Sequence, residues 1–180
     1  LAAIMAILLA LPGVSMGVHN GIGGTHVNNA DGEEISDVAE MGCLCHNPDG
    51  ADNEVTVLMA EVPYRYLAGQ TYEMVLQIIG GPSADGTYAA GFSMRVNIGS
   101  LTAGSGSENL VQTAVEGDEQ TLTHTAAGAA AADRSWTVAW TAPDSEAGDV
   151  VFRVSGNSVN GDQGATNADR WNHLMFAIPE

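Results

Sequence analysis

Apolar and polar residues alternate with a period of two along several short stretches of this chain. In 92–98 (Phe-Ser-Met-Arg-Val-Asn-Ile) and 135–141 (Ser-Trp-Thr-Val-Ala-Trp-Thr), every second residue is large and apolar. The stretch 149–155 repeats the pattern. Because successive side chains of a strand point to opposite faces of a sheet, these stretches predict strands with one buried face. The residues expected to share the core are Phe92, Met94, Val96, Trp136, Val138, Trp140, Phe152 and Val154.

Weaker alternation predicts further strands, which are separated by clusters of Gly, Pro, Asp and Asn. The remaining candidates are 54–61, 71–79, 110–115, 121–125 and 173–178. Turn clusters stand at 80–82, 99–106, 116–118, 142–144 and 156–169. About eight short strands with such spacing predict an all-β fold, an immunoglobulin-like antiparallel β-sandwich. The alanine-rich stretch 126–132 is compatible with a helical turn or a loop.

The ends of the chain define the expected domain organisation. Residues 1–11 are apolar and small residues follow to position 17, as in the end of a secretory signal. The rival interpretation is a retained N-terminal anchor; both place the rest of the protein outside the cytoplasm, either secreted or at the cell surface. We therefore expect a signal at 1–17, an irregular arm at 18–53 and one β-sandwich domain at 54–180.

The charge of the chain excludes some partners. It carries 22 acidic residues against 5 basic ones, for a net charge of −17. Such a charge repels nucleic acids and anionic lipids, so we expect no nucleic-acid partner and membrane contact only through an anchor. It is typical of proteins that stay soluble in salty water, where the repulsion is screened.

The most distinctive motif is Cys43-Leu44-Cys45-His46, which contains both cysteines of the chain. Two thiols followed by a histidine are similar to Cys-x-x-Cys-His, in which the cysteines tether a haem and the histidine binds its iron. Here the spacer is one residue short, which reduces the reach by up to about 3.5 Å. A disulfide between the two would close a very small, strained ring.

Three alternatives to haem c remain open from the residues. The two thiols and His46 could bind copper or zinc with one remote ligand, or they could carry no cofactor at all. The loop 156–169 holds carboxylate and amide side chains, of which Asp162 and Asp169 are candidates for calcium. The same residue types are also common turn formers.

The body of the chain resembles the choice-of-anchor V family of extracellular domains, which is related to the Reeler-type sandwich. The resemblance runs from position 42 to 169 and rests on Cys43, Cys45 and His46, on 68–72 (Ala-Gly-Gln-Thr-Tyr), 91–92, 124–125, 135–143 (Ser-Trp-Thr-Val-Ala-Trp-Thr-Ala-Pro) and 151–162. It implies an exported sandwich domain with varied anchors. The family pattern has Cys-x-x-Cys-His, from which this chain departs.

The resemblance also singles out His124, which stands in the family's His-Thr pair and is the first choice for a second iron ligand. His19, His26, His173 and Met94 are the other candidates. We accordingly expect either a monohaem electron-transfer module with a redox partner, or a non-catalytic surface module for adhesion or binding. No hydrolase or phosphate-binding motif is present, so the sequence does not indicate an enzyme.

Overall fold

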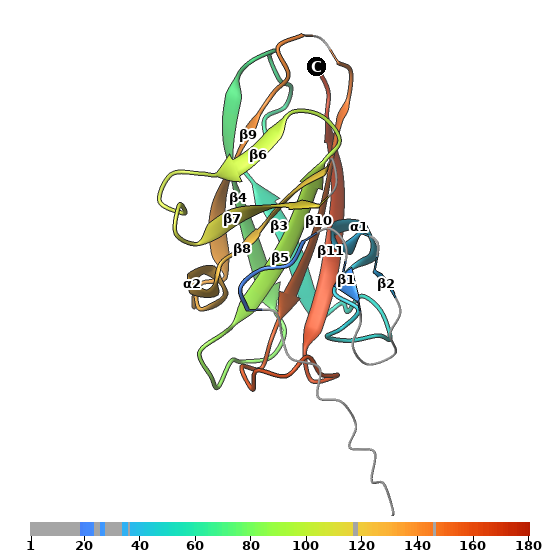
Figure 1. The fold of residues 1–180 in the computed structure, drawn as a ribbon, viewed down its shortest axis with the longest axis vertical. Coiled ribbons are helices and arrows are strands. Elements are labelled where there is room, and N and C mark those ends of the chain that lie inside the picture. Colours follow the sequence, from blue (N-terminus) through green and yellow to red (C-terminus); the bar gives the residue numbers. More distant parts are fainter. Residues whose placement is uncertain (1–18, 24–25, 28–33, 36, 117–118, 146) are drawn as a thin grey trace, which may run out of the picture.

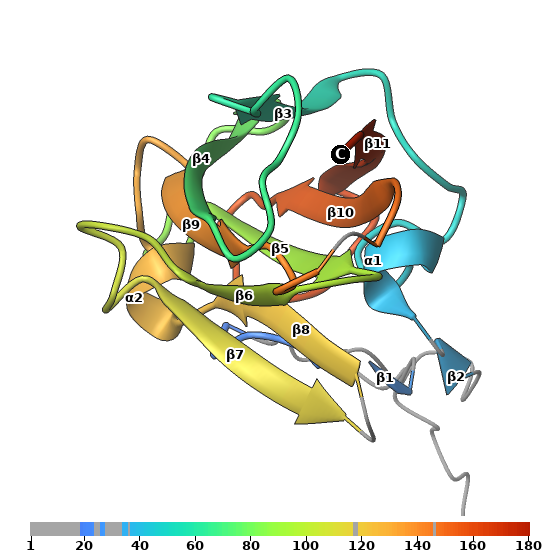
Figure 2. The same ribbon diagram turned by 90° about the horizontal axis from the view of Figure 1, so that it is seen from above.

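The computed structural model describes residues 19–23, 26–27, 34–35, 37–116, 119–145 and 147–180. The signal expected at 1–17 lies outside these residues. Within them, no helix has the length and apolar character needed to cross a bilayer. The two sheets of the sandwich face each other, and the N-terminal arm lies beside one of them (Figures 1 and 2).

The sandwich consists of a five-stranded and a four-stranded antiparallel sheet. The first has the order β11-β10-β5-β8-β7 and the second the order β3-β4-β9-β6. The strands are β3 (Val55–Ala60), β4 (Thr71–Gly80), β5 (Ala90–Val96), β6 (Ser100–Ala103), β7 (Val111–Glu116), β8 (Glu119–His124), β9 (Ser135–Thr141), β10 (Val150–Ser158) and β11 (Arg170–Ile178). The predicted fold class is therefore confirmed.

The core lies between the two sheets and contains the residues that the alternation selected. Seven of them are at most 1% exposed, while Val96 is half-buried against the same cluster. Trp140 is at its centre, with its ring centroid 5.4 Å from that of Tyr66 and 5.3 Å from that of Phe152. Its indole N–H donates to the Ile98 carbonyl at 2.9 Å, so that burial leaves no donor unsatisfied.

One strand of the sandwich was missed by the sequence. β6 lies in the stretch 99–106, which we expected to be a turn because glycines flank it. Leu101 pairs with Trp140 of β9 and is fully buried, so apolar contact across the sheet outweighs the local turn signals. β10 also runs on to Ser158, into a stretch expected to be loop, and Ala126–Ala129 forms the short helix α2.

The arm is more ordered than expected, and it changes the environment of the outer sheet face. It contains β1 (His26–Val27), β2 (Glu34–Ile35) and α1 (Val38–Met41). α1 packs on β5 and β10, as the view from above shows (Figure 2). The hydroxyl of Ser155 donates to the Ala39 carbonyl at 3.0 Å, and Ser93 is also fully buried. The arm thus covers the polar side of β5 and β10 here, which the alternation by itself would leave to water.

Candidate functional site

The Cys-His motif follows α1 as a tight turn held against β11. The amide of His46 donates to the Cys43 carbonyl at 2.9 Å, which closes the turn. Gly42, just before it, has a φ of 100°, and a Cβ there would lie 2.0 Å from the Trp171 ring. The Trp171 indole in turn donates to the Asn47 carbonyl at 2.8 Å. Trp171 thus fixes both ends of the motif, and only glycine fits at position 42.

His46 is oriented by a buried carboxylate. Its Nδ1 donates to Oδ2 of Asp169 at 2.8 Å, and the Asp169 side chain is fully buried. Two backbone amides also donate to this carboxylate, those of Asn160 (3.1 Å) and Thr166 (3.2 Å). A histidine held in this way in its neutral form has its lone pair on Nε2. This is the usual arrangement behind metal-binding histidines.

His124 stands at the end of β8, where the pairing between β8 and β5 stops. Backbone pairing with β8 covers Ser93 and Met94 of β5. The preceding residue, Phe92, is bonded by side chains of β8 instead. The Phe92 amide donates to Nδ1 of His124 at 3.0 Å, and the Thr123 hydroxyl donates to the Phe92 carbonyl at 2.7 Å. His124 is only 6% exposed. The imidazole therefore replaces a backbone partner where the pairing of β5 with β8 ends.

Gly91 provides the space for this ring. A Cβ on residue 91 would lie 2.5 Å from Cε1 of His124 and 3.0 Å from Oδ1 of Asn157. Contacts of 2.5 Å between such atoms do not occur, so any side chain at position 91 would displace the imidazole. The space that the His124 ring occupies thus explains why position 91 is a glycine.

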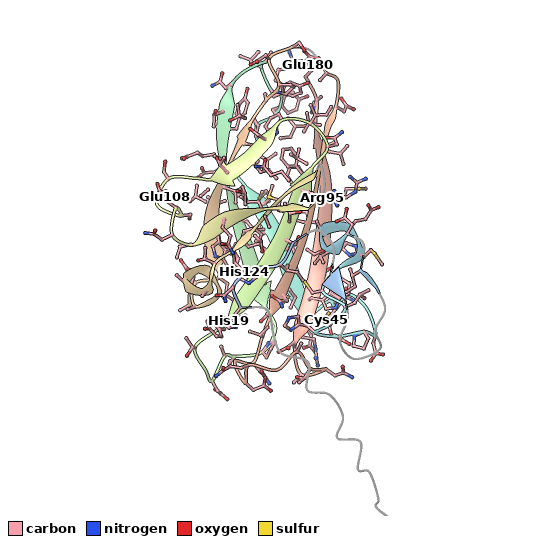
Figure 3. The ribbon with its side chains drawn as sticks, in the orientation of Figure 1. His19, Cys45, Arg95, Glu108, His124 and Glu180 are labelled. Carbon is pink, nitrogen blue, oxygen red and sulfur yellow. The ribbon has the colours of Figure 1, made fainter. Side chains whose placement is uncertain are left out.

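One pocket lies between the Cys-His turn and the end of β8. Cys43, Cys45 and His46 line it together with His124, although 78 or more positions separate them in the sequence. Most of the lining is apolar, and the cavity volume is ≈ 90 Å³. Figure 3 shows the labelled His124 and His19 on one side of this region and Cys45 on the other. We call this space, between the arm and the five-stranded sheet, the arm pocket.

The other candidate iron ligands are placed differently. His19 also lines the arm pocket and stacks on Tyr88, with ring centroids 4.7 Å apart. His173 is an exposed residue of β11, and Met94 is fully buried in the core; neither lines the pocket. The side chain of His26 lies outside the described residues.

The two cysteines are present as thiols and are half-buried. Desolvation, with a smaller contribution from Cys45, raises the pKa of the Cys43 thiol to about 12. Copper or zinc would require thiolates. Among the described residues, no three His, Cys, Asp or Glu side chains gather closely enough to hold a metal ion. The copper or zinc site remains a prediction.

The calcium candidates have protein partners. Asp169 is the carboxylate behind His46. Asp162 is exposed and accepts hydrogen bonds from the Asn160 side chain (2.9 Å) and the Gly164 amide (2.8 Å). These bonds, the Asn160 one foremost, lower the pKa of the Asp162 carboxyl. Calcium binding by either residue stays a prediction.

Sequence reasoning missed three residues of the pocket region. It assigned Asp169 to calcium, placed Asn157 in the same candidate calcium loop, and gave no chemical role to Gly91. Among the described residues, Oδ1 of Asn157 is a buried atom without a hydrogen-bond partner. The sequence offered no signal for Asn157, because position 157 continues the polar side of the β10 alternation.

Comparisons with known proteins describe the fold. No protein-family model matches the chain, and no curated protein sequence matches it. The reeler domain of human F-spondin is 17% identical over 72% of this chain and 91% of that domain, with a TM-score of 0.48. A cohesin module of a family 33 glycoside hydrolase from Clostridium perfringens is 14% identical over 70% and 94%, with a TM-score of 0.44. The chain is thus similar to Reeler-type sandwiches, while the choice-of-anchor V resemblance remains a prediction.

Proposed function

We propose that this protein is an extracytoplasmic binding module and that the arm pocket is its ligand site. We further propose that the ligand is a haem held at Cys43-Leu44-Cys45-His46. One observation carries the proposal: a single apolar pocket is lined by both thiols, by His46 with Asp169 behind it, and by His124. The apolar leader and the acidic composition support the extracytoplasmic location.

The side chains of the arm pocket are of the types that hold a haem, and its cavity of ≈ 90 Å³ would have to widen as the group enters. His46 is held with Nδ1 on Asp169 and therefore offers Nε2 as an iron ligand. Cys43 and Cys45, one turn before it, would supply the tethers. Ile35, Val38 and Phe92 contribute apolar surface suited to a porphyrin. When bound, a haem would supply one-electron transfer to this module.

Because only one residue separates the cysteines, the experiment should test whether the haem is attached to them covalently. The protein should be produced in a host with a haem-maturation system and studied by visible absorption, pyridine haemochrome and intact mass after denaturation. We expect a Soret band and a mass increase that survives denaturation. His46→Ala should remove most of the bound haem, whereas His173→Ala, which alters an exposed histidine outside the pocket, should not.

Two results would change the proposal. A Soret band that is lost on denaturation would show haem bound without thioethers. The second result is a protein without any Soret band from cells that do mature a control cytochrome. It would overturn the haem assignment of the arm pocket.

A second candidate is a surface module for adhesion or binding without a cofactor. Tyr64 and Leu67, in the connection between β3 and β4, are 89% and 63% exposed. Large apolar side chains displayed on a loop are typical of contact with a partner. Tyr64→Ser with Leu67→Ser would then abolish binding to a glycan or cell-surface preparation, and His46→Ala would leave it unchanged.

A further inference from the structure

A second pocket lies farther along β5 than the arm pocket, between α1 and the strands β5, β8 and β10. Its cavity volume is ≈ 370 Å³, against ≈ 90 Å³ for the arm pocket, and its lining is mostly polar. Sites for small molecules commonly have volumes of about 300–1,000 Å³. We propose that this pocket binds a zwitterionic α-amino acid, independently of any haem. We call it the arginine pocket; its polar lining consists of Asp37, Glu40, Arg95, Asn97, Gln120 and Arg153.

The pocket places two arginines side by side. Arg95 of β5 and Arg153 of β10 are directly opposite each other in the register of the sheet. Like charges in this position destabilise a sheet. The chain has only five basic residues, and two of them form this pair. The stability of the sheet does not explain the pair, which therefore needs negatively charged groups beside it.

The two arginines have acidic partners of unequal quality. Nη1 of Arg95 lies 2.6 Å from Oδ2 of Asp37, in a close ion pair. Nε of Arg153 lies 3.4 Å from Oε2 of Glu40, whose side chain is 60% exposed. This contact lacks hydrogen-bond geometry, so that within the described part of the chain the buried Nε of Arg153 has no hydrogen-bond partner. Arg153 is thus loosely paired, and it can bind a second carboxylate.

Two amide side chains supply further donors to the arginine pocket. The backbone N–H of Val151 donates to Oδ1 of Asn97 at 2.7 Å, and the backbone N–H of Leu101 donates to Oε1 of Gln120 at 3.2 Å. Because the two oxygens face these backbone donors, the NH₂ groups are the ends of Asn97 and Gln120 that are left for a ligand. An NH₂ group can only donate, so these ends also favour a carboxylate.

The charge balance decides between the classes of ligand. Two arginines and two carboxylates line the pocket, whereas the whole chain carries a net charge of −17. A simple anion would be repelled by the protein, and it would meet arginines whose charge is already neutralised. A cation would be attracted to the acidic surface in general and would gain little from this pocket. A zwitterion has no net charge, and it can pair with both kinds of group.

The two kinds of group are adjacent in the pocket, as they are in an α-amino acid. The guanidinium of Arg153 and the carboxylate of Glu40 are 3.4 Å apart, and an α-amino acid carries its carboxylate and its ammonium on one carbon. The ligand's carboxylate pairs with Arg153, and its ammonium pairs with Glu40. Hydrogen bonds between charged groups are stronger than those between neutral ones. The rest of the volume is left for the side chain of the ligand.

The first test compares three probes of similar size on the wild-type protein. L-alanine has both charged groups, propionate lacks the ammonium, and ethylamine lacks the carboxylate. Titration at constant ionic strength, followed by the backbone amide NMR signals of Asn97 and Gly99, measures each Kd. We expect alanine to bind at least about tenfold more tightly than either of the others, because each lacks one charge-assisted pairing. Propionate that binds as tightly as alanine, or alanine that shifts neither signal, would overturn the inference.

The second test uses variants of the pocket with the same probes. Arg153→Gln should weaken alanine binding by about tenfold or more, and Glu40→Gln should remove the preference for alanine over propionate. Arg170→Gln is the matched control, with the same change of charge at an arginine that pairs with Asp52 outside the pocket, and it should leave the affinity unchanged. An unchanged affinity in Arg153→Gln, or an equal loss in Arg170→Gln, would overturn the inference. If Arg153→Gln does not fold, the three probes on the wild type decide it alone.

Discussion

Nδ1 of His46 lies 2.8 Å from Oδ2 of Asp169, a residue 123 positions later in the sequence. The contact joins the N-terminal arm to the loop before β11. The Asp169 carboxylate is completely buried, and it also accepts hydrogen bonds from two backbone amides. The fold and the pocket therefore depend on the same residue.

Asp169→Ala should lower both stability and the order of the arm. The substitution leaves two partly buried amides and His46 without their acceptor, at a cost of about 3 kcal/mol in the free energy of unfolding. Urea denaturation measures the loss, and the NMR signal of the His46 ring should shift at the same time. Asp162→Ala is the control, since this exposed residue should give a much smaller change. Equal effects of the two variants would contradict the role given to Asp169.

Gly91→Ala should displace His124 from β5. Its new Cβ would lie 2.5 Å from Cε1 of His124, which we expect to cost about 1–3 kcal/mol in unfolding free energy. In a His124→Ala background the same substitution should cost less, because the ring that it meets is gone. A double-mutant cycle by denaturant titration measures this coupling. Strictly additive effects would show that the glycine is needed for another reason.

Trp140→Ala should remove about 3–5 kcal/mol of stability, because a fully buried ring in contact with Tyr66 and Phe152 is replaced by a cavity. Thermal and urea unfolding are the measurements. Met175→Ala, at a residue that is 67% exposed, is the control and should lie within about 0.5 kcal/mol of the wild type. A small effect at Trp140 would mean that the core has another centre.

Cys43 should make the protein less stable at high pH. Its pKa is about 12 in the folded state, against an ordinary value of 9.0, so the unfolded thiol ionises first as the pH rises. The contribution to stability is complete below pH 9 and is lost progressively towards pH 12. Urea midpoints between pH 8 and about 10.5 should therefore fall more steeply for the wild type than for Cys43→Ala. Parallel slopes for the two proteins would contradict the raised pKa.

Salt should stabilise the protein from low ionic strength upward. A net charge of −17 on one compact domain produces repulsion that salt screens over about 8–10 Å. The thermal midpoint should rise as NaCl is added, with KCl behaving alike, since the effect is screening. A flat or falling midpoint would mean that the acidic groups are spaced widely enough to be tolerated.

Much of the fold was determined by local pattern. The alternation at 92–98, 135–141 and 149–155 selected the inner face of three strands, because a period of two places every second side chain on the same side of a sheet. The pattern could not show β6, because its four residues stand among glycines and depend on Leu101 packing opposite Trp140. Nor could it show that Ser93 and Ser155 are buried, since the arm that covers them comes from elsewhere in the chain.

At the site, the ligand donors are visible in the chain as a motif, whereas their partners are set by the packing of distant segments. Cys43, Cys45 and His46 stand together in the chain, so their chemistry is visible as a motif. The pairing of His46 with Asp169, the ring of His124 above Gly91 and the buried Oδ1 of Asn157 join strands and loops that are far apart in sequence. A hydrogen bond depends on distance and direction in space, and these are set only when the two sheets pack and the arm lies on one of them.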